Sequence, residues 1–366
     1  MTSTFQKRIA VMPGDGIGPE VTREAVKVLR TLTDLGIGQF DIARFPYGGQ
    51  EYRKTGIALP DEVIEEFTKN YDAILLGALG DPNAPDNSYV RRILLGLRSG
   101  LDLFIGYRPV YVIHPELHQL HQMEPAQINF TIFRDIAEGF AINLGGVRET
   151  QRDRTIAIQE SLHTREGITR VIRSAFEFAD QQGLKKVTLT DKSNILRHTH
   201  TLWSEVFHTI SQEFADKIST HMNVDSFLYE VIRNPGKFQV VVTLDLFGDV
   251  LSEFCAALQG GVGVAGTSYW NPGSIGLFRP VHGPAPGAAG KNISNPFGAI
   301  ECIRQMLLFF NRTKTAQLIQ DSLHHCVEHR LVTPDLGGSL GTGEVGDYVC
   351  QTVERLYTES QREVSA

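Results

Sequence analysis

Residues 243–253, TLDLFGDVLSE, join an apolar run to three acidic residues and decide how the rest of the chain is interpreted. The run at residues 240–243 is rich in β-branched side chains, which predicts a strand covered on both faces of a sheet. Asp245, Asp249 and Glu253 then recur every four residues, so a helix would place them on one face. A hard divalent cation such as Mg²⁺ or Mn²⁺ would relieve their repulsion. A solvated acidic helix face is the alternative.

Length and composition describe an ordinary soluble globular protein. The chain has 366 residues, 42% hydrophobic and 21% charged, which predicts two domains or one large α/β unit. A net charge of −7 and the lack of a basic tract argue against nucleic-acid binding. The four cysteines have no CxxC spacing, which indicates reduced thiols and gives no zinc signature. No signal-peptide stretch or membrane-spanning run is found, so we expect no membrane partner and a cytoplasmic location.

The N-terminal segment predicts a strand, a glycine-rich turn and a helix. Residues 8–12, RIAVM, predict a short strand, residues 14–18 read GDGIG, and an apolar stripe follows with helical spacing. The order resembles a dinucleotide-binding fold, but GDGIG is not GxGxxG. We therefore interpret the glycines as a tight turn that needs positive φ.

Cationic residues gather near predicted strand ends. Residues 88–109, SYVRRILLGLRSGLDLFIGYRP, mix arginine with leucine on one helical face, as a pocket for a partly apolar anion would. Arginines paired with surface acids are the alternative. Ligands of α/β sheets bind at the carboxyl ends of strands, where several of these residues are expected, and both interpretations stay open. The residues concerned are Arg91, Leu94, Leu95, Arg98, Arg108, Arg134 and Lys192.

A long loop follows residue 276. Small residues and prolines surround His282, which predicts a rigid, irregular segment able to approach a flat ligand closely, and a helix is expected after Asn295. Alternating β and α signals along the whole chain predict an α/β fold with mixed sheets.

Six stretches together resemble one family. They are GDGIGPEV, LLGLRSGLDLFIGYRP, TDKSN, LDLFGDVLSE, PVHGPAPGAAGKNISNP and TPDLGGSLGTGEVGD. In this order they resemble the β-decarboxylating dehydrogenases of isocitrate, isopropylmalate, tartrate and D-malate, with most similarity to the tartrate/D-malate and isopropylmalate branches. The resemblance implies an isopropylmalate dehydrogenase-like α/β fold, which is not a Rossmann fold. It implies a first domain of residues 1–109 and 258–366 and a second, dimerising domain of residues 110–257.

The resemblance also implies an activity. Such enzymes oxidise, and mostly decarboxylate, a 2-hydroxy acid with a β-carboxylate, such as isopropylmalate, D-malate or tartrate. They use Mg²⁺ or Mn²⁺ and NAD or NADP, in homodimers with shared active sites. By resemblance Arg98, Arg108 and Arg134 hold the β-carboxylate, and Lys192 is the base or proton relay. The implied metal ligands are Asp249, Glu253 and a partner subunit's copy of Asp225, which also counts as catalytic. Leu94 and Leu95 would line the substrate pocket, and the expected cofactor contacts are His282, Gly283, Ala285 and Asn295.

Several positions depart from the family pattern. Ala141 stands where a tyrosine protonates the enolate, Asp245 where asparagine is usual, and Glu253 where aspartate is usual. The cofactor loop differs at Arg279, Pro284, Gly287 and Ala288. Three hypotheses follow: a working dehydrogenase with or without decarboxylation, a biosynthetic relative with an unusual substrate, and a catalytically silent binding or regulatory homologue.

Overall fold

The computed structural model describes residues 5–118, 120, 124–149 and 154–365. Two compact units make up the chain, and each is described by itself. Unit 1 consists of Met1–Asp102, Val112–His121 and Ala256–Ala366, and unit 2 of Leu103–Tyr111 and Gln122–Cys255. The division into residues 1–109 with 258–366 and residues 110–257 stays a prediction.

Unit 1 contains five strands in the order β2-β1-β3-β12-β11. Their bounds are β1 (Gln6–Met12), β2 (Gln39–Arg44), β3 (Ala73–Leu76), β11 (Gly266–Trp270) and β12 (Gly276–Pro280). All neighbours are parallel except β11 and β12, which are antiparallel. The sheet is therefore mixed. All of β3 is buried, which explains its uninterrupted apolar sequence.

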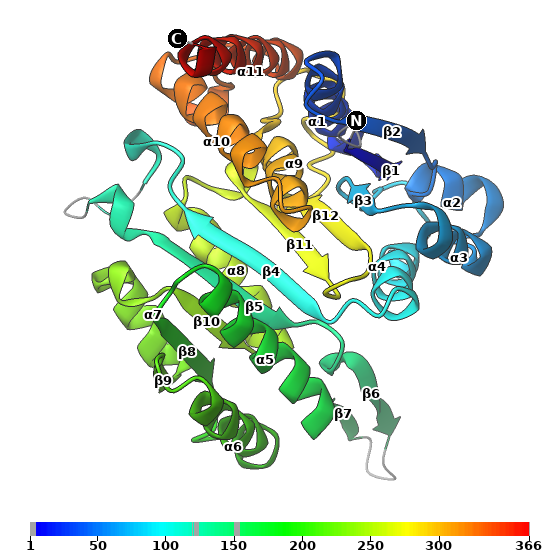
Figure 1. The fold of residues 1–366 in the computed structure, drawn as a ribbon. Coiled ribbons are helices and arrows are strands. Elements are labelled where there is room, and N and C mark those ends of the chain that lie inside the picture. Colours follow the sequence, from blue (N-terminus) through cyan, green and yellow to red (C-terminus); the bar gives the residue numbers. More distant parts are fainter. Residues whose placement is uncertain (1–4, 119, 121–123, 150–153, 366) are drawn as a thin grey trace. The chain divides into compact units, whose positions relative to one another are not determined.

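The helices of unit 1 form groups around these strands (Figure 1). Helices α1, α9, α10 and α11 pack on one another, and α9 contacts β11 and β12. Every residue of the apolar stripe in α1 is buried, as predicted. The helical bounds are α1 (Gly18–Asp34), α2 (Gly49–Thr55), α3 (Asp61–Asn70), α4 (Ser88–Gly100), α9 (Phe297–Phe309), α10 (Thr313–Glu328) and α11 (Thr342–Ser365), with 3₁₀ turns η1 (Pro115–Leu117), η4 (Val262–Val264) and η5 (Pro334–Leu336).

Unit 2 contains the strand order β4-β5-β10-β8-β9, again mixed because only β4 and β5 are antiparallel. Strand β10 (Val240–Thr243) is fully buried, as its β-branched sequence predicts. The other strands are β4 (Ile105–Tyr111), β5 (Asn129–Asp135), β8 (Lys186–Asp191) and β9 (Ile218–Asn223). The helical elements are α5 (Arg165–Gln181), α6 (Arg197–Glu213), α7 (Val224–Arg233), α8 (Asp245–Leu258), η2 (Pro125–Gln127) and η3 (Pro235–Lys237). The last residues of α8 belong to unit 1.

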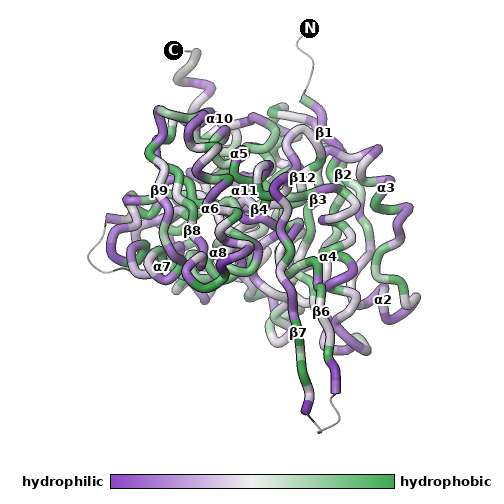
Figure 2. The backbone as a smooth tube through the Cα atoms, turned by 90° about the horizontal axis from the view of Figure 1, so that it is seen from below, coloured by the Kyte–Doolittle hydropathy of each residue, from purple (hydrophilic) through white to green (hydrophobic). Residues whose placement is uncertain are grey.

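A separate antiparallel pair, β6 (Gly139–Glu149) and β7 (Thr155–Leu162), extends from unit 2 (Figure 2). It carries exposed apolar side chains, namely Ile142, Leu144, Val147, Ile156, Ile158 and Leu162. Buried apolar residues are thus concentrated in the other strands of each unit and in the helices that cover them. All four cysteines are buried free thiols, as expected. None of the described helices is long and apolar enough to cross a membrane.

Candidate active site

Arg134 lies near the end of β5 in unit 2, packed closely against two glycines. A Cβ atom on Gly248 would come 2.5 Å from Cγ of Arg134, and one on Gly106 would come 3.3 Å from its Cβ. Both glycines therefore leave room for the aliphatic stem of the arginine, which lies against α8 with only 11% of its side chain exposed. The guanidinium is held in place by packing before any ligand binds.

Two acidic residues of α8 accept hydrogen bonds from the two terminal nitrogens of this guanidinium. Nη2 of Arg134 donates to Oδ1 of Asp245 at 2.7 Å, and Nη1 donates to Oδ1 of Asp249. The first contact is buried, since the Asp245 side chain is 10% exposed, whereas that of Asp249 is 62% exposed. Residues 245–258 are helical, which is the condition under which the spacing of the acids places them on one face. The positive group between the first two acids is an arginine of the same chain.

Lys192 and Asp225 form a second pair in unit 2. Lys192 follows β8 directly, and its Nζ donates to Oδ1 of Asp225, in the first turn of α7, at 2.7 Å. This hydrogen bond lowers the pKa of the Asp225 carboxyl, so the pair is ionic. Lys192 and Asp225, the two residues predicted to be catalytic, are therefore in contact within one chain.

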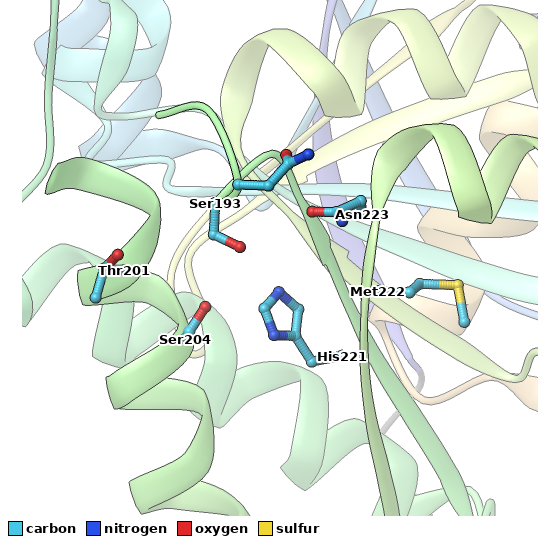
Figure 3. A pocket seen from close by; sticks show the side chains of 7 residues that line it. Ser193, Thr201, Ser204, His221, Met222 and Asn223 are labelled. Carbon is cyan, nitrogen blue, oxygen red and sulfur yellow. The ribbon is translucent and has the colours of Figure 1, made fainter. Parts of the chain in front are cut away.

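A polar pocket of about 440 Å³ lies beside this pair, at the carboxyl ends of β8 and β9 (Figure 3). His221 donates from Nε2 toward Oδ1 of the buried Asp191 at 3.0 Å, and this hydrogen bond raises the pKa of the imidazole. The lining offers hydroxyl, amide and imidazole groups, which suit a polar ligand. Its residues are Ser193, Asn194, Thr201, Ser204, His221, Met222 and Asn223.

A buried network lies next to Arg134 in the sequence. Burial raises the pKa of Asp135 to about 7, and burial lowers the pKa of His163. Nδ1 of His163 accepts from Trp203 at 3.2 Å, while its Nε2 lies 3.0 Å from the hydroxyl of Ser161. Glu138 accepts from the backbone N–H and the hydroxyl of Thr164. Protein groups therefore already contact both ring nitrogens of His163 and the carboxylate of Glu138.

The remaining predicted arginines differ in environment. Arg108 is 1% exposed and lies in the middle of β4 rather than at its end, with Nη2 donating to the Ser252 carbonyl at 3.2 Å. Arg98 of α4 donates to the hydroxyl of Tyr269 at 3.1 Å and lies over that ring. Arg91 and Arg92 are exposed on α4. Leu94 and Leu95 are half-buried on α4.

The GDGIG turn of unit 1 is organised by Asp15. Its carboxylate accepts hydrogen bonds from the backbone N–H groups of Gly49 and Gly80, at 2.6 and 2.8 Å, and from the hydroxyl of Tyr89 at 2.6 Å. A Cβ on Gly16 would lie 1.9 Å from the carbonyl oxygen of Pro284, which also accepts from the N–H of Ile17. The segment is thus a tight, closely packed turn, as interpreted from the sequence.

The loop after β12 contains the predicted cofactor contacts. His282 is buried, which lowers its pKa, and its Nε2 has no hydrogen-bond partner among the described residues. A Cβ added at Gly283 would meet nothing within 4 Å, which leaves space beside the ring. These two features suit a bound ligand with hydrogen-bonding groups. The amide of Asn295 instead bonds to Asp335 and to the N–H of Phe297, at the start of α9.

The three predicted metal ligands do not form one group within the described chain. Asp225 faces Lys192, Asp249 faces Arg134, and Glu253 is exposed on α8. Carboxylates are nevertheless the donors that Mg²⁺ and Mn²⁺ prefer, so the residues present suit such an ion. Their assembly into a site stays a prediction.

Sequence reasoning missed three residues that shape these surroundings: Asp15, Tyr269 and His221. The acid inside GDGIG was a visible signal for Asp15, because glycine turns are often tied by one carboxylate. Tyr269 and His221 had no such signal, since their partners are remote in the sequence.

Most of the chain matches one known protein family. Residues 8–349 match the family described as isocitrate/isopropylmalate dehydrogenase. The chain belongs to this family. The family is also the one that the sequence motifs indicated, and the expectation of an oxidoreductase of this family is confirmed.

Relatives of the isocitrate/isopropylmalate dehydrogenase family match over nearly their whole length. The chain is 35% identical to 3-isopropylmalate dehydrogenase of Thermobifida fusca, over 94% of this chain and 97% of that protein. It is 35% identical to homoisocitrate dehydrogenase of Methanocaldococcus jannaschii, with coverages of 95% and 98%. A probable tartrate dehydrogenase/decarboxylase of Agrobacterium vitis is 32% identical, with coverages of 94% and 97%.

The fold of the chain also matches that of a solved structure. The crystal structure of isocitrate dehydrogenase from Methylococcus capsulatus matches with a TM-score of 0.84 and 29% identity, over 95% of this chain and 99% of that one. The predicted α/β fold with mixed sheets is therefore confirmed.

Proposed function

We propose that the protein is a metal- and NAD(P)-dependent dehydrogenase that oxidises, and decarboxylates, a malate-like 2-hydroxy acid with a β-carboxylate. The contact of Arg134 with Asp245 and Asp249 carries this proposal. A fixed guanidinium suits a planar carboxylate, and it lies directly beside an exposed acid suited to a divalent cation. The relatives named for isopropylmalate, homoisocitrate and tartrate all act on acids of this class.

The roles of the chain's own groups follow from their chemistry. Arg134 orients the substrate by its β-carboxylate, with Arg108 and Arg98 as further cations. Lys192 would accept or relay the proton of the 2-hydroxyl through Nζ, and Asp225 keeps Nζ in position at 2.7 Å. Asp225, Asp249 and Glu253 would hold Mg²⁺ or Mn²⁺, and His282 with Gly283 would contact NAD or NADP. When bound, the metal and nicotinamide supply charge stabilisation and a hydride acceptor.

The reaction is balanced as a two-electron oxidation. The hydroxyl loses a proton and C2 loses a hydride to the nicotinamide, giving the 2-oxo acid. Loss of CO₂ leaves an enolate carbon that needs a proton, and Ala141 has none to give. Water or another group must therefore protonate this carbon, so we expect protonation of the enolate to be the slowed step.

We also propose a homodimer with shared active sites. Exposed apolar side chains on β6, β7, α7 and α8 of unit 2 support it, because a monomer rarely exposes so many. Since Lys192 and Asp225 are paired within one chain, both would be supplied to the partner's site together.

The test is turnover of D-malate, tartrate, isopropylmalate, isocitrate and homoisocitrate with Mn²⁺ and either cofactor, followed by the absorbance of reduced nicotinamide. Lys192→Ala is the matched inactive control. Absence of turnover with every acid, together with no cofactor binding by calorimetry, would contradict the proposal and favour a catalytically silent binding homologue.

The sharing of active sites between subunits is tested by mixing two inactive variants. Arg134→Ala and Lys192→Ala chains should regain activity only when their subunits exchange to form mixed dimers.

A further inference from the structure

The end of α10 carries two histidines and a glutamate that face one another. His325 and His329 are four residues apart, so they lie on one face of the helix, and their ring centroids are 3.9 Å apart. With Glu328 they form a group in which one donor atom from each residue lies within 4.8 Å of the others. This group belongs to unit 1, in a different part of the sequence from the carboxylates discussed above.

His329 is already oriented as a ligand would be. Its Nδ1 lies 3.0 Å from the carbonyl oxygen of His325. A carbonyl can only accept, so Nδ1 must carry the hydrogen and Nε2 keeps its lone pair. Metal-bound histidines usually donate their second ring nitrogen to a carbonyl or carboxylate in this way.

The other two donors are accessible. His325 is half-buried, and its ring lies against that of His329. Glu328 is exposed, with Oε2 3.8 Å from Nδ1 of His329. In the Asp135, Glu138 and His163 network, by contrast, protein groups already occupy both ring nitrogens and the glutamate.

The donor set selects the kind of metal. Imidazole nitrogens suit Zn²⁺, Ni²⁺ and Cu²⁺, whereas Mg²⁺ and Mn²⁺ prefer oxygen ligands. Two histidines four residues apart on a helix, with one carboxylate, provide three zinc ligands and leave the fourth position to water. We propose that His325, Glu328 and His329 form a surface site for one Zn²⁺-like transition-metal ion, separate from the Mg²⁺ or Mn²⁺ of the catalytic reaction.

The experiment is a calorimetric titration of metal-stripped full-length protein with ZnCl₂, in saturating Mg²⁺ so that oxygen-ligand sites are filled. We expect one Zn²⁺ per chain. His325→Ala and His329→Ala should each lose this binding step, and Glu328→Gln should weaken it. His208→Ala removes an exposed histidine from α6 and should bind as the unchanged protein does.

Spectroscopy gives a second measurement on the same proteins. Co²⁺ in place of Zn²⁺ should give visible absorption of four-coordinate nitrogen and oxygen ligation, which His329→Ala abolishes. No Zn²⁺ step in the unchanged protein, or a step that survives both histidine substitutions, would overturn the assignment. All three positions are partly or fully exposed, so the variants should fold. The outcome does not depend on whether any hydroxy acid is turned over.

Discussion

Asp245 should weaken the binding of a substrate carboxylate, because it already occupies Nη2 of Arg134. In Asp245→Asn, the amide oxygen still accepts from Nη2, so the arginine keeps its position while one negative charge is removed. Two like charges about 4 Å apart repel by roughly 4 kcal/mol at an effective dielectric constant of 20. Solvent near the exposed Asp249 screens part of this, so we expect a gain closer to about 1.5–3 kcal/mol, the range of a hydrogen bond to a charged group.

That gain corresponds to a dissociation constant roughly 10–100-fold lower for D-malate, the smallest acid of the class. The assay is calorimetry with Mg²⁺ and without nucleotide, so that no turnover occurs. Asp321→Asn, an exposed aspartate on α10, is the control and should leave the constant unchanged. If the unchanged protein binds D-malate and Asp245→Asn binds it no better, Asp245 does not compete for Arg134 and the reasoning is refuted.

Three further variants test neighbouring features. Gly248→Ala places a methyl group 2.5 Å from the Arg134 stem, so we expect a loss of about 1–3 kcal/mol in urea unfolding and weaker acid binding, whereas Gly236→Ala, with ordinary contacts, should be neutral. Ala141→Tyr should raise the rate at which the protonated, decarboxylated product forms by up to about 10²-fold, and Ala141→Phe, which lacks the hydroxyl, should not. Asp135 has its pKa raised from 3.8 to about 7, so the folded protein binds the extra proton and loses stability as pH rises through this window. Asp135→Asn should flatten this dependence of the urea midpoint, and an unchanged slope would show that another group causes it.

The fold could be predicted because its signals are local. The β-branched run of β10 and the apolar stripe of α1 both report burial directly, since covered strands and amphipathic helices need those patterns. The position of Arg108 within β4 was harder, because a strand's end depends on its pairing with β5 and not on its own residues.

The sequence predicted which residues belong to the candidate site, but not how they are arranged in space. Lys192 and Asp225 were each found from motifs, but their 2.7 Å contact depends on how β8 and α7 lie together in unit 2. The acids at 245 and 249 suggested a cation between them, and the sequence offered no means to choose an arginine 111 residues away over a metal ion. Long-range partners of this kind need three-dimensional packing.

The carbonyl of Pro284 sets a limit for protein engineering. Its oxygen accepts a hydrogen bond from the N–H of Ile17 and lies close to Gly16. Asp15, in the same turn, accepts hydrogen bonds from the backbone of two other segments, at Gly49 and Gly80. Attempts to alter the contacts proposed for a nicotinamide cofactor would target residues 284–288. Replacing the Pro284 side chain leaves that carbonyl in place, whereas an inserted or deleted residue would move it and disturb the N-terminal turn. Redesign of this loop should therefore keep its length and vary only its side chains.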